Sequence, residues 1–87
     1  MRLQDKIAVI TGAASGIGHE TARRFAREGA VVIVADRNED AAETVAQELR
    51  NTGAVAEAVA FDVSVEAEVK ALMDGVVERH GRLDILV

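Results

Sequence analysis

Residues 11–18 form a glycine-rich segment, Thr-Gly-Ala-Ala-Ser-Gly-Ile-Gly, whose spacing suits the binding of a phosphate group. The segment follows an apolar run and precedes an amphipathic stretch, so it predicts the turn between a strand and a helix. We expect Gly12 to let the chain turn where a Cβ atom would clash, Gly16 to let the backbone approach a pyrophosphate, and Gly18 to let the helix pack tightly on the sheet. The N–H groups that open the helix, together with its dipole, would bind the anion without a basic side chain.

Asp36 is the next candidate, because it follows the second apolar run of the chain. It lies 18 positions after Gly18, near the separation of about 20 at which a carboxylate accepts hydrogen bonds from the ribose hydroxyls of a dinucleotide. A glycine pattern alone also fits a tight structural turn. The strand before the segment, the helix after it and Asp36 together favour a dinucleotide-binding loop. Its candidate binding residues are Gly12, Ser15, Gly16, Ile17 and Gly18.

The charges after the second run bear on the choice between NAD and NADP. A 2′-phosphate beside Asp36 would meet a like charge in a partly dry site, and the glycine loop contains no Lys or Arg to offset it. Arg37 supports the opposite preference, because its guanidinium could turn onto a phosphate. We therefore expect NAD as the cofactor, with NADP as the less favoured alternative, and include both Asp36 and Arg37 in the candidate site.

Short apolar runs alternate with amphipathic stretches along the chain. The runs predict strands at 7–10, 31–34, 54–61 and 83–87, and the stretches between them carry apolar residues at helical spacing. The order β-α-β-α-β-α-β implies a doubly wound α/β fold with a parallel sheet and right-handed crossovers.

The predicted helices have recognisable ends and apolar stripes. Asn38 and Ser64 are predicted N-caps of the second and third helices. The glycines at 29, 53 and 81 suit the left-handed residue that follows a helix. The stripes include Ile17 and Phe25 in the first helix, and Met73 and Val77 in the third, so we expect these side chains to pack against the sheet.

Composition excludes several classes of function. The 87 residues include 10 basic and 15 acidic side chains, a formal charge of −5, which disfavours a nucleic-acid-binding surface. The absence of Cys excludes disulfides, thiolate metal sites and cysteine nucleophiles. The longest uncharged apolar stretch, 29–35, is far below the ~20 residues of a membrane span, and the N-terminus lacks the apolar centre of a signal peptide. We expect a soluble, cytoplasmic protein with no nucleic-acid or membrane partner.

His19 and His80 are the only histidines. Neither has a second His or a Cys at ligand spacing, so no metal site is predicted. His19 falls in the first turn of a predicted helix, and His80 ends another, where a cation suits the helix dipole. We expect both imidazoles to be solvated.

The motif T-G-x-x-x-G-x-G and the segments around it resemble the short-chain dehydrogenase/reductase family. Residues 6–18 are similar to the opening of that family, Asp62-Val63 to its adenine-contacting pair, and residues 81–87 to its fourth strand. The resemblance covers essentially the whole chain. It implies a Rossmann fold with strand order 3-2-1-4, in which the first two helices cover one face of the sheet. Asp62 has a second reading, in which it only adds negative charge at the start of a helix.

This resemblance implies an NAD(P)-dependent oxidoreductase that transfers hydride between a nicotinamide and a secondary alcohol or ketone, for example a 3-oxoacyl reductase. It also implies a catalytic Asn, Ser, Tyr and Lys, none of which maps onto these residues. Because the chain ends inside an apolar run, we expect residues 1–87 to be the N-terminal, dinucleotide-binding part of one incomplete Rossmann domain. Alone it should bind ADP-like groups weakly and be inactive, whereas the whole protein would bind a small alcohol or ketone and form a homo-oligomer.

Two other functions remain compatible with the residues. Another nucleotide-binding α/β domain, such as half of a methyltransferase, also uses a glycine turn and an acid after the second strand, although its loop spacing normally differs. A non-enzymatic α/β interaction module would bind no adenine nucleotide at all.

Overall fold

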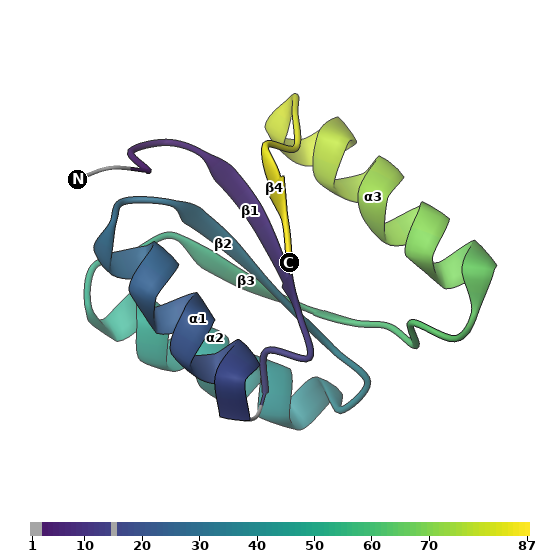
Figure 1. Cartoon of the computed structure of the whole chain (residues 1–87), viewed down its shortest axis with the longest axis horizontal. Helices are drawn as coiled ribbons and strands as arrows, with labels where there is room; N and C mark the ends of the chain where they lie inside the picture. The colour runs from purple at the N-terminus through teal and green to yellow at the C-terminus, as the bar shows by residue number, and fades with distance from the viewer. Residues whose placement is uncertain (1–2, 15) are drawn as a thin grey trace.

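The computed structural model describes residues 3–14 and 16–87. Strands and helices alternate as the sequence predicts (Figure 1). Along the chain the elements are β1 (Ile7–Thr11), α1 (Gly16–Arg27), β2 (Val31–Asp36), α2 (Glu39–Asn51), β3 (Ala56–Ala60), α3 (Glu66–His80) and β4 (Ile85–Leu86). The predicted α/β class is confirmed, and no helix among the described residues is long and apolar enough to cross a membrane.

The four strands form one parallel sheet in the order β3-β2-β1-β4, as predicted. β1 and β2 occupy its centre and are buried almost throughout, which explains why their sequences are apolar without alternation. β3 and β4 are shorter than the runs at 54–61 and 83–87 predict. Pairing nevertheless continues past β4, because the N–H of Val87 donates to the carbonyl oxygen of Val9 at 2.9 Å.

Helices cover the two faces of the sheet unequally. α1 and α2 lie on one face and α3 on the other (Figure 1). The core under α1 and α2 includes Ala8, Ile10, Val32 and Val34 from the strands and Ala22, Val45, Ala46 and Leu49 from the helices. The core under α3 is smaller, and there only Leu72 and Val76 among the helical residues are buried. Val77, predicted to pack in the core, is 46% exposed, because α3 turns only a narrow stripe toward the sheet.

The helix ends test the capping predictions. Asn38 is the N-cap of α2, and its side-chain oxygen accepts a hydrogen bond from the N–H of Ala41 at 3.0 Å. The prediction for Ser64 is wrong: Val65 is the N-cap of α3 and makes no side-chain cap bond. The Ser64 hydroxyl donates instead to Asp62 Oδ1 at 2.7 Å, so it stabilises the turn before the helix.

Asp84 fastens the start of β4 to the start of β1. Its Oδ2 accepts hydrogen bonds from the N–H of Ile7 at 2.8 Å and from Nε of Arg82 at 2.9 Å. The Ile7 N–H, with Arg82 beside it, lowers the pKa of the Asp84 carboxyl. Nothing in the local sequence pattern indicates this hydrogen bond, because its two residues are 77 positions apart.

Candidate functional site

The three glycines of the loop differ in what they provide. Gly12 and Gly16 have φ values of 62° and 53°, in the left-handed region that favours glycine. A Cβ atom at either would meet nothing within 4 Å. The turn at Gly12 therefore has the backbone conformation that disfavours a Cβ atom, as expected, and open space adjoins the loop. At Gly18 an added Cβ would lie 2.2 Å from the carbonyl oxygen of Gly12, so the helix packs closely there, with the loop after β1 as its nearest contact.

The residues beside these glycines also contribute to the site. Ser15 lies outside the described residues. Ile17, expected in the apolar stripe of α1, is 87% exposed. It lies in the first helical turn, before α1 meets the sheet, so that part of the stripe prediction is wrong. An apolar side chain this exposed beside the loop is available to contact a ligand.

Asp36 ends β2 and faces the loop. Its Oδ2 accepts a hydrogen bond from the N–H of Ala14 at 3.2 Å, and its Oδ1 accepts one from the N–H of Asn38 at 3.0 Å. A third bond links the two segments, from the N–H of Ala13 to the carbonyl oxygen of Ala35 at 3.4 Å. The loop after β1 is therefore tied to the end of β2.

The N–H groups of Gly16, Ile17 and Gly18 differ from those of Ala13 and Ala14 within the described part of the chain. Among residues 3–14 and 16–87, no loop, cap or side-chain hydrogen bond is donated by the N–H of Gly16, Ile17 or Gly18. Helix geometry leaves the first N–H groups of α1 without partners inside the helix. These donors and the positive end of the helix dipole can bind an anion.

Arg37 and Asp62 face each other across the ends of β2 and β3. The Nε of Arg37 lies 3.9 Å from Oδ2 of Asp62, and the Arg37 side chain is 77% exposed. Hydrogen bonds from Ser64 lower the pKa of the Asp62 carboxyl, and Arg37 adds to this effect. Asp62 thus stabilises the turn before α3 by accepting hydrogen bonds from Ser64, a contact that neither reading of Asp62 predicts. Its remaining acceptor capacity leaves the adenine role open.

A cavity of 270 Å³ opens among these elements. It is lined by Thr11, Gly12, Asp36, Arg37, Phe61 and Val63. The parallel register places the ends of β1, β2 and β3 at one edge of the sheet, pairing Thr11 with Ala35 and Asp36 with Ala60. Ligands of open α/β sheets bind at this carboxyl edge. Val63, which is 67% exposed, contributes an apolar wall.

Thr11, the last residue of β1, is hydrogen-bonded to the residue that follows the neighbouring strand β4. Its N–H and its hydroxyl both donate to the carbonyl oxygen of Val87, at 2.9 Å and 2.7 Å. Thr11 is part of the glycine motif but is not among the predicted site residues. It holds β4 in place next to the loop.

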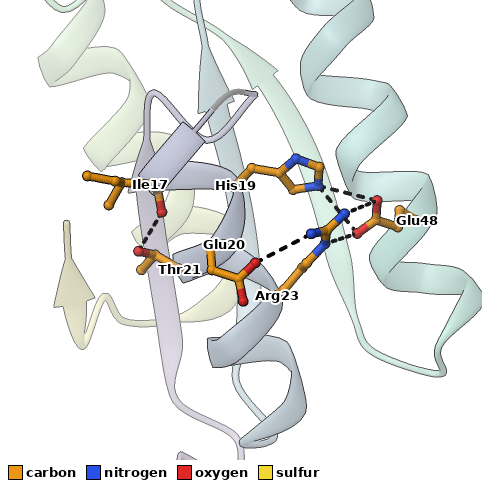
Figure 2. A network of polar contacts seen from close by, with 6 residues as sticks. All are labelled: Ile17, His19, Glu20, Thr21, Arg23 and Glu48. Atoms are coloured by element: carbon orange, nitrogen blue, oxygen red, sulfur yellow. Dashed lines mark hydrogen bonds and ion pairs between the residues drawn. The ribbon is translucent and has the colours of Figure 1, made fainter.

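A polar network joins α1 to α2 behind the loop (Figure 2). Glu48 of α2 accepts hydrogen bonds from Arg23 at 2.7 Å and 3.2 Å, and His19 Nε2 lies 3.3 Å from each of its oxygens. Glu20 adds a further contact to Arg23 at 3.4 Å. Arg23 and His19 lower the pKa of the Glu48 carboxyl to about 2. Ion pairs therefore hold the two helices together in addition to apolar packing.

The two histidines do not behave as expected. The side chains of His19 and His80 are 25% and 22% exposed, so both are half-buried rather than solvated. His80 Nε2 lies 3.4 Å from Oε1 of Glu57, to which Arg79 also donates. Each imidazole faces a carboxylate from a neighbouring element, which sequence spacing could not reveal. Within residues 3–14 and 16–87 no group of three potential ligands could hold a metal ion.

The site fits the adenosine and diphosphate parts of a dinucleotide. A Cβ atom at Gly12 or Gly16 would occupy open space, and the lack of one leaves room there for a phosphate. The first turn of α1 supplies N–H groups as hydrogen-bond donors. Asp36 places a carboxylate, which can accept hydrogen bonds, beside the cavity. None of the side chains around the cavity is a nucleophile beside a base, so the arrangement supports binding and holds no catalytic pair.

Comparison with known proteins agrees with this geometry. The family model of the short chain dehydrogenases matches residues 6–87. Meso-2,3-butanediol dehydrogenase of Serratia marcescens is 44% identical to this chain over 87 residues, which are 100% of this chain and 34% of that protein. The chain spans between 31% and 34% of the length of the first curated relatives it matches.

Solved structures superpose closely on the same residues. A 7α-hydroxysteroid dehydrogenase complexed with NADH and 7-oxo glycochenodeoxycholic acid has a TM-score of 0.94 at 46% identity, over 98% of this chain and 33% of that one. A metagenomic short-chain oxidoreductase in complex with NADP also has a TM-score of 0.94, at 36% identity, over 99% of this chain and 39% of that one.

Proposed function

Because the chain belongs to the short-chain dehydrogenase family, we propose that the protein containing it is an oxidoreductase that uses a nicotinamide dinucleotide and acts on a secondary alcohol or ketone. Residues 1–87 form the cofactor-binding part of its Rossmann domain. The single observation that carries the proposal is the arrangement of the loop after β1, with the first turn of α1 packed on Gly12 and open space beside Gly12 and Gly16.

In this proposal the described residues hold the adenosine half of the cofactor. The first-turn N–H groups of α1 bind the diphosphate, at Gly16 to Gly18. Asp36 accepts hydrogen bonds from the ribose hydroxyls, and Asp62 with the N–H of Val63 contacts the adenine. Ser15 and Ile17 complete the loop side of the site. This assignment is supported by the cavity that Gly12, Asp36 and Val63 help to line.

NAD is the preferred cofactor in this proposal. Asp36 places a carboxylate beside the cavity, where a 2′-phosphate would be repelled. Arg37, the residue that would favour NADP, lies near Asp62 and is highly exposed. A highly exposed ion pair contributes at most about 1 kcal/mol, so Arg37 can leave Asp62, and weak binding of NADP is expected.

The described side chains bind and orient, and the bound cofactor supplies the hydride chemistry. No Tyr occurs among the 87 residues, so the proton transfer implied for this family has no donor here. The chain alone is therefore expected to bind ADP-like groups without turnover. The relatives act on molecules as different as a butanediol and a bile acid, by their names, and the substrate pocket of this protein is outside the described site. Homo-oligomer formation and a cytoplasmic location remain predictions for the whole protein.

The test is calorimetric titration of the whole protein with NAD, NADP and ADP, with S-adenosylmethionine as the competitor ligand. NAD should bind more tightly than NADP, ADP should compete with it, and S-adenosylmethionine should not. Oxidation of a panel of secondary alcohols, followed by the absorbance of the reduced nicotinamide, measures the activity. Failure of every adenine nucleotide to bind would support the interaction module instead.

A further inference from the structure

The carboxylate of Asp36 holds two different segments of the chain. Its Oδ2 accepts from the N–H of Ala14 in the glycine loop, at 3.2 Å, and its Oδ1 accepts from the N–H of Asn38 just before α2, at 3.0 Å. Hydrogen bonds to a charged acceptor are stronger than bonds between neutral groups. The side chain thus connects the end of β2 to the loop that opens α1.

The bond to Ala14 adds to two other restraints on the loop, the burial of Ala13 in the core and the close packing of Gly18 on Gly12. Ala14 lies between Gly12 and Gly16, which both adopt left-handed φ values. A Cβ atom added to either glycine would have no neighbouring atom within 4 Å. Glycine has more accessible backbone conformations than any other residue, so a loop built on it needs contacts to keep one shape. The nearest such contacts are those of Ala14 with Asp36 and of Ala13 with Ala35.

From this geometry we propose that Asp36 is a positioning residue for the diphosphate-binding loop, in addition to the ribose contact assigned to it above. The proposal rests on the proposed function, because it concerns the affinity of the same site. By holding Ala14, the carboxylate keeps the glycine loop against the end of β2, beside the open space at Gly12 and Gly16 in which the diphosphate is proposed to bind. Each carboxylate oxygen has two lone pairs, so both ribose hydroxyls can be accepted while the two N–H bonds remain.

This double role has a consequence for cofactor preference. Replacing Asp36 with a neutral residue removes the repulsion of a 2′-phosphate, but it also releases the loop that binds the diphosphate common to NAD and NADP. The gain in NADP affinity should therefore be smaller than the loss of repulsion alone would give. Asn is an incomplete substitute, because its amide has one acceptor oxygen and cannot serve both the Ala14 and the Asn38 N–H groups.

The decisive experiment separates the loop contact from the ribose contact. The whole protein and its Asp36→Ala variant are titrated with NAD and with an NAD analogue that lacks both hydroxyls of the adenosine ribose. A residue that only binds those hydroxyls cannot affect the analogue. We expect Asp36→Ala to weaken the analogue by about tenfold as well, the effect of losing one charge-assisted hydrogen bond. Equal affinity of the analogue for both proteins would overturn the proposal.

A matched control and a second readout complete the design. Glu39→Ala removes a neighbouring acid from the exposed first turn of α2 and should change the analogue affinity by less than twofold. Amide hydrogen exchange of the ligand-free protein should become about tenfold faster at Ala14 in Asp36→Ala. Exchange at Gly81, whose N–H donates to the carbonyl oxygen of Val77 at the end of α3, should stay unchanged. Faster exchange at both amides would indicate general loosening and contradict a positioning role. If NAD fails to bind the unmodified protein, the proposed function itself fails.

Discussion

The α-carbon of Gly18 faces the carbonyl oxygen of Gly12 so closely that an added Cβ would lie 2.2 Å from that oxygen and 2.8 Å from its carbon. The atoms in the way are backbone, so they cannot move aside as a flexible side chain would. The first turn of α1 is consequently packed directly on the loop that precedes it. This contact determines where the first N–H groups of the helix lie relative to the edge of the sheet.

Gly18→Ala should therefore damage both stability and cofactor binding. The added methyl forces the loop and the helix apart, which we expect to lower the free energy of unfolding by about 1–3 kcal/mol. Urea unfolding of the whole protein measures this, and titration should show NAD affinity reduced by more than tenfold. Gly75→Ala is the control, because its Cβ would meet only the flexible end of Arg79, at 3.1 Å. Alanine suits a helix better than glycine, so Gly75→Ala should be at least as stable as the unmodified protein.

Gly16→Ala should separate the cost of backbone strain from the cost of lost binding space. Gly16 has a φ of 53° and no atom near its missing Cβ. A non-glycine residue in this conformation costs about 1–2 kcal/mol of stability. Its methyl would in addition occupy the space assigned to the diphosphate, so NAD affinity should fall by more than tenfold.

Gly53→Ala provides the comparison for this variant. Gly53 also has a positive φ, of 94°, and open space around it. It lies between α2 and the start of β3, however, whereas the glycine loop follows the end of β1. The stability loss should be similar and NAD affinity unchanged. Equal affinities of Gly16→Ala and Gly53→Ala for NAD would place the diphosphate elsewhere.

The contact of Glu48 with Arg23 and His19 predicts a pH dependence of stability. The pKa of Glu48 is lowered to about 2 in the folded protein, from an ordinary value of 4.5. A carboxyl with a lower pKa when folded stabilises the fold above its unfolded pKa, and this stabilisation is lost as pH falls from 4.5 toward 2. The pair is partly exposed, so the contribution should not exceed about 1 kcal/mol.

Urea unfolding between pH 7 and pH 3 measures this effect, with Glu48→Gln as the comparison. Asp62 and Asp84 also have lowered pKa values and contribute to the acid sensitivity of both proteins. The difference between Glu48→Gln and the unmodified protein isolates Glu48. That difference should shrink as the pH falls, and a difference that stays constant would contradict the assignment.

Asn38→Ala should destabilise α2. The Asn38 side chain caps the helix by accepting the N–H of Ala41 at 3.0 Å, and alanine cannot replace that acceptor. The expected loss is about 1 kcal/mol in the free energy of unfolding. Asn38→Asp keeps a side-chain oxygen at the same position and should retain most of the stability. An Asn38→Ala protein as stable as the original would show that the cap makes no contribution.

Much of the fold could be predicted because its signals are local. The central strands are continuous apolar runs, and the glycines at 29, 53 and 81 do adopt left-handed φ values of 90°, 94° and 82° after the helices. Asn38 was identified as a cap because an Asn before two acidic residues favours a helix start. The same reasoning failed at Ser64, because the neighbouring Asp62 binds its hydroxyl and the helix begins one residue later.

The amino-acid sequence by itself determined the α/β order, the strand order through its family resemblance, and the segment that would hold a phosphate. These follow from hydrophobic period and from glycine chemistry, which act over a few residues. Only the tertiary structure decided which groups meet across the chain: Asp36 with Ala14, Glu48 with His19 and Arg23, and Asp84 with Ile7. Such contacts depend on how parallel strands and their helices are placed in space, because a charged side chain can reach several partners and local sequence does not select among them.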